Sequence, residues 1–426
     1  MLFFNHQKSS KENFRNMTKN KLFFISDVHI GSNAPTNWYQ DEINGPFLET
    51  ALGFIKNQAE SVQELILLGD LFDQWMDPPE VLPPDFKTII AANPRIFGGM
   101  FNGQHVTGAF MELLDALKGN VVYMNGNHDM YITPSDIATL KSPGGYIPRV
   151  INELFYKPMA CNNRLICTHG HPYSMFSAPN LANYPPGFPG LSLGYFVTRL
   201  SALWSAQHFQ NEQSDISAMK NGGDPHGLGF IEKALAGVSE AVMEDKGDLA
   251  DLMIDAFQEA TNRETFYFLM PDNSKVTIKD VLLMYKGLYK QYPQSTQIPA
   301  YYFDKNDTIT RLAALGECDI LNKLDSFARH LSQDYRVIIM GHTHTPEDRV
   351  IQCLTTFQNN VYSNTGFNCP SLADMENPKK PKYPTFTEVA LDNNQGVFYV
   401  SVYKVIKDNG QYKVERAMDP YRVNIE

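Results

Sequence analysis

Five short apolar runs, each followed directly by Asp, Asn or His, constrain the fold of this 426-residue chain more than any other feature. The runs are 22–26, 64–68, 120–124, 164–168 and 337–340. Continuous apolar runs of this length, bounded by turn residues, are typical of strands buried on both faces of a sheet. Side chains just past the carboxyl ends of such strands project into the crevice where open α/β sheets bind ligands. The sequence therefore predicts an α/β fold with a ligand site at one sheet edge.

The polar residues after these runs have a common chemistry. They form five motifs: Asp27-Val28-His29, Gly69-Asp70, Gly126-Asn127-His128-Asp129, His169-Gly170-His171 and Gly341-His342-Thr343-His344. Taken alone, a loop Asp is a common turn former and a lone His is usually structural. Together, carboxylate, imidazole and amide side chains at one edge indicate a site for a divalent first-row metal. None of the five motifs contains Cys, which argues against a soft thiolate site.

The order of these five motifs resembles that of the calcineurin-like metallophosphoesterase superfamily. The resemblance covers residues 21–129, 164–171 and 335 to about 402. The segment Gly69-Asp70-Leu71-Phe72-Asp73-Gln74-Trp75 is also similar to the UDP-2,3-diacylglucosamine pyrophosphatase branch. Those enzymes usually have Arg where this chain has His128, and they are much shorter.

The resemblance implies a four-layer αββα sandwich built from residues 21–171 and 335–426. Residues 172–334 leave the family pattern and show helical periodicity, so we expect a mostly helical insertion that forms a lid. The expected helices are 229–244, 247–261, 277–289 and 317–332, with Asp248 and Thr277 as caps. Residues 1–20 are polar and basic, and we interpret them as a flexible leader without a signal-peptide apolar centre.

The resemblance also implies a dinuclear centre. One metal would be held by Asp27, His29 and His344, the other by Asn127, His169 and His342, with Asp70 bridging the two. Mn²⁺ is the expected metal, and Fe, Zn, Ni or Co also suit these ligands. In this family the nucleophile is a hydroxide between the two ions, and the metals stabilise the charge that develops on the phosphoryl group.

Four further polar residues receive roles beside these ligands. By resemblance, His128 is the general acid that protonates the leaving group. We expect the adjacent Asp129 to orient the His128 imidazole and to raise its pKa. Asp73 is expected to hydrogen-bond to a metal ligand, and His171 to support the site rather than to bind metal itself.

The general acid favours a phosphodiesterase or phosphomonoesterase acting on a small substrate, because an alcohol needs a proton in order to leave. The alternative is a pyrophosphatase of a nucleotide-linked glycolipid at the membrane surface, and a nuclease is a further possibility. A non-catalytic, metal-free scaffold is the hypothesis from another class, but such scaffolds lose ligands and this chain keeps all seven.

The composition of the chain limits which partners and which location are expected. The chain has 36 basic and 47 acidic residues, a net charge of −11, so no polymeric nucleic acid is expected as a partner. Five cysteines without paired spacing predict reduced thiols and a cytoplasmic location. No apolar run is long enough to span a bilayer.

Two apolar features remain open. Trp75 lies in a proline-rich loop and either lines the substrate pocket or packs under the loop. Residues 172–209 are rich in aromatic and aliphatic side chains and nearly uncharged. They form either a hydrophobic lid that contacts acyl chains or a membrane surface, or the core that joins the insertion to the main domain.

Overall fold

The structure is a computed structural model, which describes residues 19–161, 163–173, 177–178, 191–208, 267–285, 328–331, 334–344, 347–352, 359–367, 369, 375, 379, 381–392 and 394–425. Nearly all of the expected leader and the expected helices 229–244 and 247–261 lie outside these residues. All five apolar runs that opened the sequence analysis form strands.

The larger sheet has eight strands within the described residues, in the order β15-β14-β13-β1-β2-β5-β6, with β16 pairing to β14. They are β1 (Lys21–Ile25), β2 (Val62–Leu68), β5 (Val121–Met124), β6 (Arg149–Ile151), β13 (Thr385–Asp392), β14 (Val397–Asp408), β15 (Gln411–Arg416) and β16 (Tyr421–Asn424). Strands β1, β2, β5 and β6 are parallel, so their carboxyl ends meet at one edge. The C-terminal strands β13, β14, β15 and β16 pair antiparallel with their neighbours.

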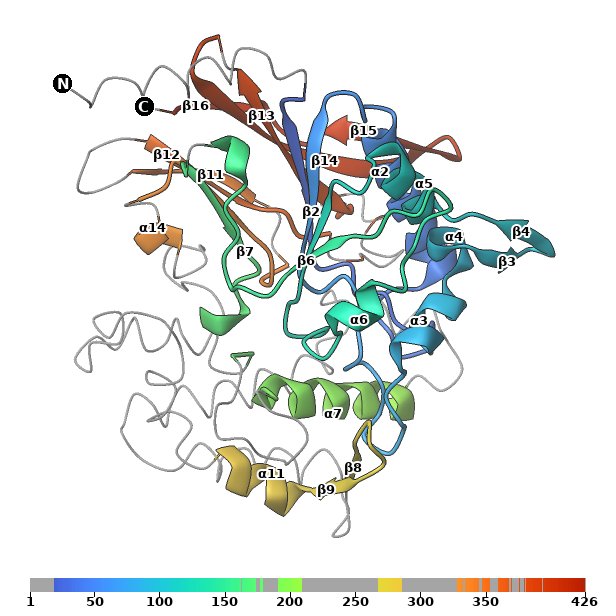
Figure 1. Cartoon of the computed structure of the whole chain (residues 1–426). Coiled ribbons are helices and arrows are strands. Elements are labelled where there is room, and N and C mark those ends of the chain that lie inside the picture. The colour runs from blue at the N-terminus through green and yellow to red at the C-terminus, as the bar shows by residue number, and fades with distance from the viewer. Residues whose placement is uncertain are drawn as a thin grey trace, which may run out of the picture.

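The smaller sheet has the order β11-β12-β10-β7 in the described part of the chain. Its strands are β7 (Leu165–Thr168), β10 (Val337–Met340), β11 (Glu347–Gln352) and β12 (Asn359–Asn364). β7, β10 and β12 run parallel, which places the ends of β7 and β10 side by side. Figure 1 shows the two sheets packed against each other, with helices on the outer side of the larger one.

Both faces of the larger sheet are buried. Leu22, Phe24, Ile66 and Leu68 point inward and pack on Leu165 and other side chains of the smaller sheet. The alternate residues belong to a second core beneath the helices. Burial on both faces explains why these strands are continuously apolar in sequence.

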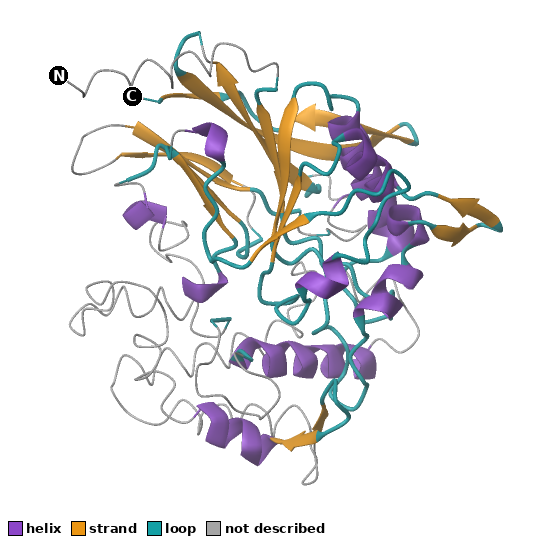
Figure 2. Ribbon diagram, viewed as in Figure 1, coloured by secondary structure: helices purple, strands orange, loops and turns teal. Residues whose placement is uncertain are grey.

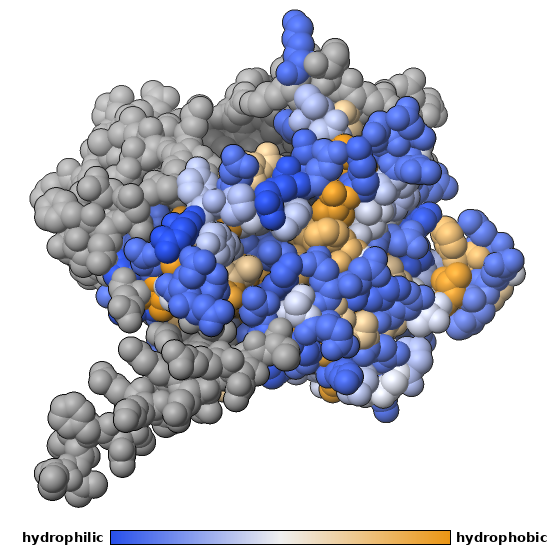
Figure 3. Space-filling view, turned by 90° about the horizontal axis from the view of Figure 1, so that it is seen from above, coloured by the Kyte–Doolittle hydropathy of each residue, from blue (hydrophilic) through white to orange (hydrophobic). Residues whose placement is uncertain are grey.

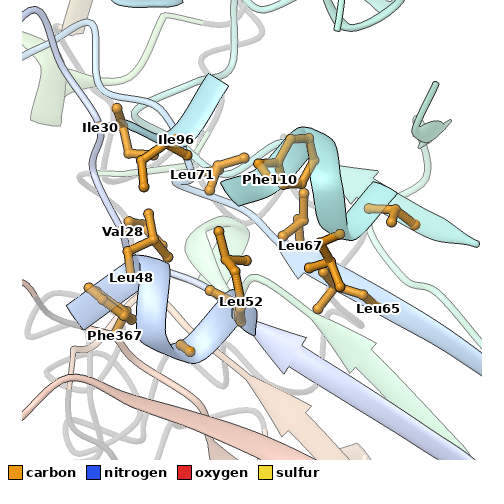
Figure 4. Packing of buried hydrophobic residues seen from close by; sticks show 14 of the residues in the cluster. Val28, Ile30, Leu48, Leu52, Leu65, Leu67, Leu71, Ile96, Phe110 and Phe367 are labelled. Carbon is orange, nitrogen blue, oxygen red and sulfur yellow. The ribbon is translucent and has the colours of Figure 1, made fainter. Parts of the chain in front are cut away.

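Helices cover the second core. They are α2 (Asp41–Lys56), α3 (Phe86–Ala92), α4 (Pro94–Phe97), α5 (Ala109–Ala116) and α6 (Pro134–Ile137), and a hairpin of β3 (Gly99–Phe101) and β4 (Gln104–Val106) projects beside them (Figure 2). Figure 4 shows Leu48 and Leu52 of α2 facing Val28, Leu67 and Leu71.

The boundaries of α2 follow from the residues at its two ends. α2 begins at Asp41, because Asp41 and Glu42 favour the amino end of a helix. The residues after Lys56 form hydrogen-bonded turns that lead into β2.

Within the expected insertion, the described elements are α7 (Leu193–His208), β8 (Tyr267–Leu269), β9 (Lys275–Thr277), α11 (Ile278–Tyr285) and α14 (Ala328–Leu331). Thr277 caps α11 as predicted: its hydroxyl accepts from the Asp280 N–H, and Asp280 accepts from the Thr277 N–H. The short hairpin β8–β9 was not expected. α14 leads directly into β10 and falls within the expected helix 317–332.

The apolar residues at the start of α7 are internal. Leu193, Tyr195, Phe196 and Leu200 are all buried. For the described part of 172–209, this burial favours the interpretation that these side chains join the insertion to the core. None of the helices in the described ranges has the length and apolar character needed to cross a bilayer. Figure 3 shows a mostly hydrophilic surface on the described part of one face, with small separate apolar patches.

Candidate metal centre

The expected ligands meet where the strand ends of the two sheets converge. Asp27 and His29 follow β1, Asp70 follows β2 and Asn127 follows β5. From the smaller sheet, His169 follows β7, and His342 and His344 follow β10. Apolar residues that alternate with the ligands, such as Val28, Ile30 and Leu71, are buried in the core beneath (Figure 4). This alternation fixes the loops and directs the polar side chains to the site.

These residues form two groups that share one carboxylate. One donor atom each from Asp27, His29, Asp70 and His344 lie within 4.8 Å of one another, and so do donor atoms of Asp70, His169 and His342. Asn127 joins the second group, with its Oδ1 3.2 Å from Nε2 of His169. The structure thus brings together all seven residues. Of these seven, Asp70 is the one that belongs to both donor groups.

The tautomers of two histidines leave Nε2 available for a cation. Nδ1 of His29 lies 3.1 Å from the Asp73 carboxylate, and Nδ1 of His169 lies 2.8 Å from the Leu68 carbonyl. Each Nδ1 therefore carries a proton, so Nε2 is the nitrogen that would bind a cation. Nε2 of His29 lies only 3.0 Å from Nε2 of His344. Two imidazole nitrogens aimed at each other in a buried site fit a shared divalent metal.

Backbone strain marks the same residues. Asp27, His29, Asp70, His342 and His344 all have positive φ values, between 52° and 71°. The left-handed conformation costs an L-residue roughly 1–2 kcal/mol. Five such residues in one site, held by the strands before them, indicate geometry kept for function.

Glycines allow the loops to approach closely. A Cβ on Gly69 would meet the His169 ring, and a Cβ on Gly126 would lie 2.7 Å from the Asp70 backbone nitrogen. Gly69 also has a φ of +84°, which favours glycine. Gly69 and Gly126 are therefore required by the close packing of the ligands.

Burial and the charges of neighbouring groups shift the pKa values of the ligands in opposite directions. Burial raises the pKa of Asp27 to about 6 and lowers those of His29 and His342 to about 4 and about 3. For Asp70, burial is outweighed by His169 and His128, and its pKa falls well below the usual value. At His169 burial lowers the pKa, but the charge of Asp70 outweighs it and raises the pKa to about 10. Neutral His29 and His342 and ionised Asp70 are already in the forms that bind a metal, whereas His169 would release a proton on binding.

His128 is paired with a different carboxylate from the one expected. Its Nδ1 lies 3.0 Å from Oδ2 of Asp73. Asp129 instead accepts hydrogen bonds from the Gly126 N–H at 2.6 Å and the Tyr123 hydroxyl at 2.8 Å, and also from the Leu71 N–H. The prediction that Asp129 orients His128 is therefore wrong. Asp129 turns inward and fastens the loop after β5 to the loop after β2.

Asp73 serves two histidines at once, because the same Oδ2 contacts Nδ1 of His29 and Nδ1 of His128. The expectation that Asp73 hydrogen-bonds to a metal ligand is confirmed. Burial lowers the pKa of His128, but the charges of Asp73 and Asp70 outweigh it, so the pKa is raised. A protonated His128 is the form that a general acid requires.

Two tryptophans line the His128 side of the site. Trp75 stacks on His128 with ring centroids 4.3 Å apart and an interplanar angle of 26°. Trp75 is buried, and it also contacts Tyr195 of α7 with ring centroids 5.8 Å apart. Trp38 contacts His29 at 4.7 Å and His128 at 5.3 Å. The sequence analysis missed Trp38, and its only signal was an aromatic residue nine positions after His29.

His171 lies beside the second group and outside it. Its ring centroid is 5.4 Å from that of His169, and it is buried. Its Nδ1 has no hydrogen-bond partner among the described residues. Burial lowers the pKa of His171 well below the usual value. The residue is therefore neutral and next to a predicted ligand, as expected for a supporting role.

A family model and a curated protein are each similar to a part of this chain. Residues 21–216 match the family model of the calcineurin-like phosphoesterases. A UDP-2,3-diacylglucosamine hydrolase from Ralstonia nicotianae is 23% identical over 155 residues, which are 36% of this chain and 47% of that protein. The chain thus matches about half the length of this curated relative.

Two solved structures are also similar to this chain, one over a small part of it and one over most of it. A single mutant of Vps29 from Entamoeba histolytica is 21% identical and covers 22% of this chain and 46% of its own, with a TM-score of 0.15. A conserved uncharacterised protein from Streptococcus pneumoniae TIGR4, titled a predicted phosphoesterase, is 10% identical and covers 94% and 99%, with a TM-score of 0.26.

The family match includes the motifs of β1, β2, β5 and β7, and the structure adds the histidines after β10 to the same site. Over residues 21–216 the chain is therefore similar to the calcineurin-like phosphoesterases, and this similarity supports assignment to the metallophosphoesterase superfamily.

Proposed function

We propose that this chain hydrolyses phosphate mono- or diesters of small alcohols with two divalent metal ions, Mn²⁺ being the expected metal. Asp27, His29 and His344 would hold one ion, Asn127, His169 and His342 the other, and Asp70 both. When bound, such a pair supplies Lewis acidity toward phosphoryl oxygens and a water acidified toward neutral pH. The observation that supports this proposal is the pair of donor groups that share Asp70.

The chain's own residues provide the proton for the leaving group. Asp73 holds Nδ1 of His128, which leaves Nε2 to donate a proton to the departing oxygen as the P–O bond breaks. Trp75 and Trp38 keep the imidazole in place from the sides. An alkoxide needs this proton, whereas a pyrophosphate leaves as a stabilised anion. His128 therefore favours an ester over a pyrophosphate.

The first experiment combines metal analysis with hydrolysis of bis-p-nitrophenyl phosphate in Mn²⁺. We expect close to two metal ions per chain and hydrolysis that stops in excess chelator. Asp70→Asn should lose both metal and activity. A purified protein without metal, inactive in Mn²⁺, would support the metal-free scaffold instead.

A second experiment tests His128. His128→Ala should slow esters with alkyl leaving groups by about 10²–10⁴-fold, the usual contribution of a general acid. Esters of p-nitrophenol should slow far less, because p-nitrophenolate leaves without a proton. Equal losses on both substrates would show that His128 is not the general acid. They would not count against the proposed metal centre.

A pyrophosphatase acting on a nucleotide-linked glycolipid is the second candidate. It is supported by the relative named a UDP-2,3-diacylglucosamine hydrolase and by the segment Gly69–Trp75. Val81 and Leu82, in the loop after Trp75, are 45% and 44% exposed and offer a small apolar contact for a lipid or membrane surface. Detergent-dependent hydrolysis of such a glycolipid, faster than that of any simple ester, would favour this candidate.

Two further expectations belong to the same proposal. A cytoplasmic location is supported by Cys161 and Cys167, which are buried free thiols. A nuclease is disfavoured by the net charge of −11. Cleavage of single-stranded DNA by the same preparation would reverse that choice.

A further inference from the structure

Arg199, in the middle of α7, is a fully buried cation bound almost entirely by backbone carbonyls. Its Nε donates to the Asp77 carbonyl at 3.1 Å, and its Nη1 donates to the Leu269 carbonyl at 2.7 Å. Its Nη2 donates to the carbonyls of Pro78 at 2.9 Å, Pro79 at 3.0 Å and Val81. Within the described ranges, no carboxylate lies at ion-pair distance from this guanidinium. Its N–H groups donate mainly to backbone carbonyls of the loop 77–81.

The loop 77–81 needs donors from elsewhere. Pro78 and Pro79 have no backbone N–H, and a tight turn leaves several carbonyls facing the same side. An unpaired buried carbonyl costs roughly 1–3 kcal/mol, so an outside donor is required. Arg199 supplies most of these bonds, and the Leu269 N–H of β8 donates to the Pro79 carbonyl at 2.7 Å. The loop is therefore shaped by residues of the insertion.

The same loop continues from the segment that holds His128. The Trp75 N–H donates to Oδ1 of Asp73 at 2.8 Å, while Oδ2 of Asp73 contacts His128. The Trp75 ring stacks on His128. Tyr195, one turn before Arg199, packs against the edge of Trp75 at 5.8 Å and 89°, and its hydroxyl accepts from Nη1 of Arg199 at 2.7 Å. A continuous set of contacts thus joins Arg199 to His128.

We propose that Arg199 is a positioning residue for proton donation by His128, and that α7 is a permanent part of the leaving-group side of the site. The inference rests on the proposed function. Asp73 fixes only one nitrogen of the imidazole, so the ring plane depends on Trp75, and Trp75 depends on the loop and on Tyr195. A displacement of about 1 Å in a catalytic group can cost about 100-fold in rate.

The test compares two leaving groups in the full-length, Mn²⁺-loaded protein. We expect Arg199→Gln to slow a phosphodiester with an alkyl leaving group by at least about 10-fold, and bis-p-nitrophenyl phosphate by less than about 3-fold. The loss should be in kcat rather than KM, and metal content should not change. Arg199→Lys keeps a cation with three donors and should restore part of the alkyl rate.

Arg149→Gln is the matched control. Like Arg199, Arg149 donates to a tyrosine hydroxyl, that of Tyr156, but it also pairs with the Glu64 carboxylate and is on the edge strand β6. Its substitution should leave the ratio of the two rates unchanged. His128→Gln is measured alongside. If it lowers both rates equally, the proposed role of His128 fails.

The outcomes separate the two proposals. A selective loss in both His128→Gln and Arg199→Gln supports the inference. A selective loss in His128→Gln with an equal loss, or none, in Arg199→Gln overturns the inference and leaves the proposed function standing. If Arg199→Gln does not fold, Arg199→Lys and Tyr195→Phe decide by the same ratio, and an unchanged ratio in both overturns the inference.

Discussion

The carboxylate of Asp73 lies 3.0 Å from Nδ1 of His128, although Asp129 is the residue next to His128 in sequence. The neighbour along the chain is directed into the interior, and a residue 55 positions away takes its place. The same Asp73 oxygen contacts His29 at 3.1 Å. One carboxylate thus links a predicted metal ligand to the predicted proton donor.

Asp73→Asn should therefore affect catalysis. Without the Asp73 charge the pKa of His128 falls, because burial then dominates, and less of the histidine is protonated near neutral pH. We expect a loss of about 10–100-fold on alkyl esters, within the range of general-acid effects, and a basic limb of the pH–rate profile that moves to lower pH. Steady-state kinetics from pH 5 to 9 measure both effects.

Asp129→Asn should have a different result. Asp129 holds the loops after β2 and β5 together through backbone N–H groups and the Tyr123 hydroxyl, so its loss should lower the free energy of unfolding by roughly 1–3 kcal/mol. The basic limb of the pH–rate profile should stay at the same pH as in the parent protein. If Asp129→Asn shifted that limb as far as Asp73→Asn does, the assignment of Asp73 as the partner of His128 would be wrong.

Metal should stabilise the fold. The site gathers Asp27, Asp70 and several imidazoles in a buried place, where unpaired charges and lone pairs are costly. A ligand that binds only the folded state at 100 times its Kd stabilises by about 2.7 kcal/mol. Thermal unfolding should therefore move to higher temperature with Mn²⁺ and to lower temperature with chelator, whereas Asp70→Asn should respond to neither. An equal response in Asp70→Asn would indicate binding elsewhere.

Most of the site could be predicted from the sequence, because each ligand follows a strand that is legible as an apolar run. Local pattern fixed the positions of Asp27, Asp70 and Asn127 at adjacent strand ends, and the resemblance supplied the roles. It was harder to predict which residues contact each other across the site. Sequence adjacency favoured Asp129 for His128, since nothing in the pattern shows which way a loop carboxylate turns after a glycine.

The contribution of the insertion could not be predicted for a related reason. Arg199 is the one cation in an apolar segment, and its donors are satisfied by carbonyls, which have no sequence signature. Trp38 likewise reaches His29 and His128 from an irregular loop without periodicity.

Gly126→Ala tests the close approach of two motifs. The added methyl group would lie 2.7 Å from the backbone nitrogen of Asp70 and 2.8 Å from its Cγ. Neither atom can yield without moving Asp70, so we expect metal binding and activity to fall sharply and stability to fall by roughly 1–3 kcal/mol. Metal content after gel filtration and urea unfolding provide the measurements.

Gly53→Ala is the matched control for that substitution. Gly53 lies inside α2, and its added methyl would meet no atom within 4 Å. It should leave activity unchanged and raise stability by about 0.4–1 kcal/mol. Similar losses of metal in both variants would show that the space around Asp70 is not the cause.

Asp77 gives a pH dependence whose sign differs from that of a salt-bridged carboxylate. Burial raises its pKa from 3.8 to about 6, Asp73 adds to this, and Arg199 only partly opposes it. Its Oδ2 has no hydrogen-bond partner in the part of the chain that the structure describes. Between pH 3.8 and about 6 the folded state therefore holds a proton that the unfolded state has lost. Stability falls as the pH rises through this window.

Asp77→Asn removes that penalty while keeping the size of the side chain. We expect the variant to be more stable than the parent by roughly 1–3 kcal/mol at pH 8, from about two pKa units at 1.36 kcal/mol each and less after relaxation. The advantage should shrink as the pH falls from about 6 toward 4. Urea unfolding at pH 8 and pH 5, both in chelator so that metal binding does not vary, measures the difference. A variant that is less stable at pH 8, or an advantage that grows at pH 5, would mean that the Asp77 carboxylate is stabilised by a partner when ionised.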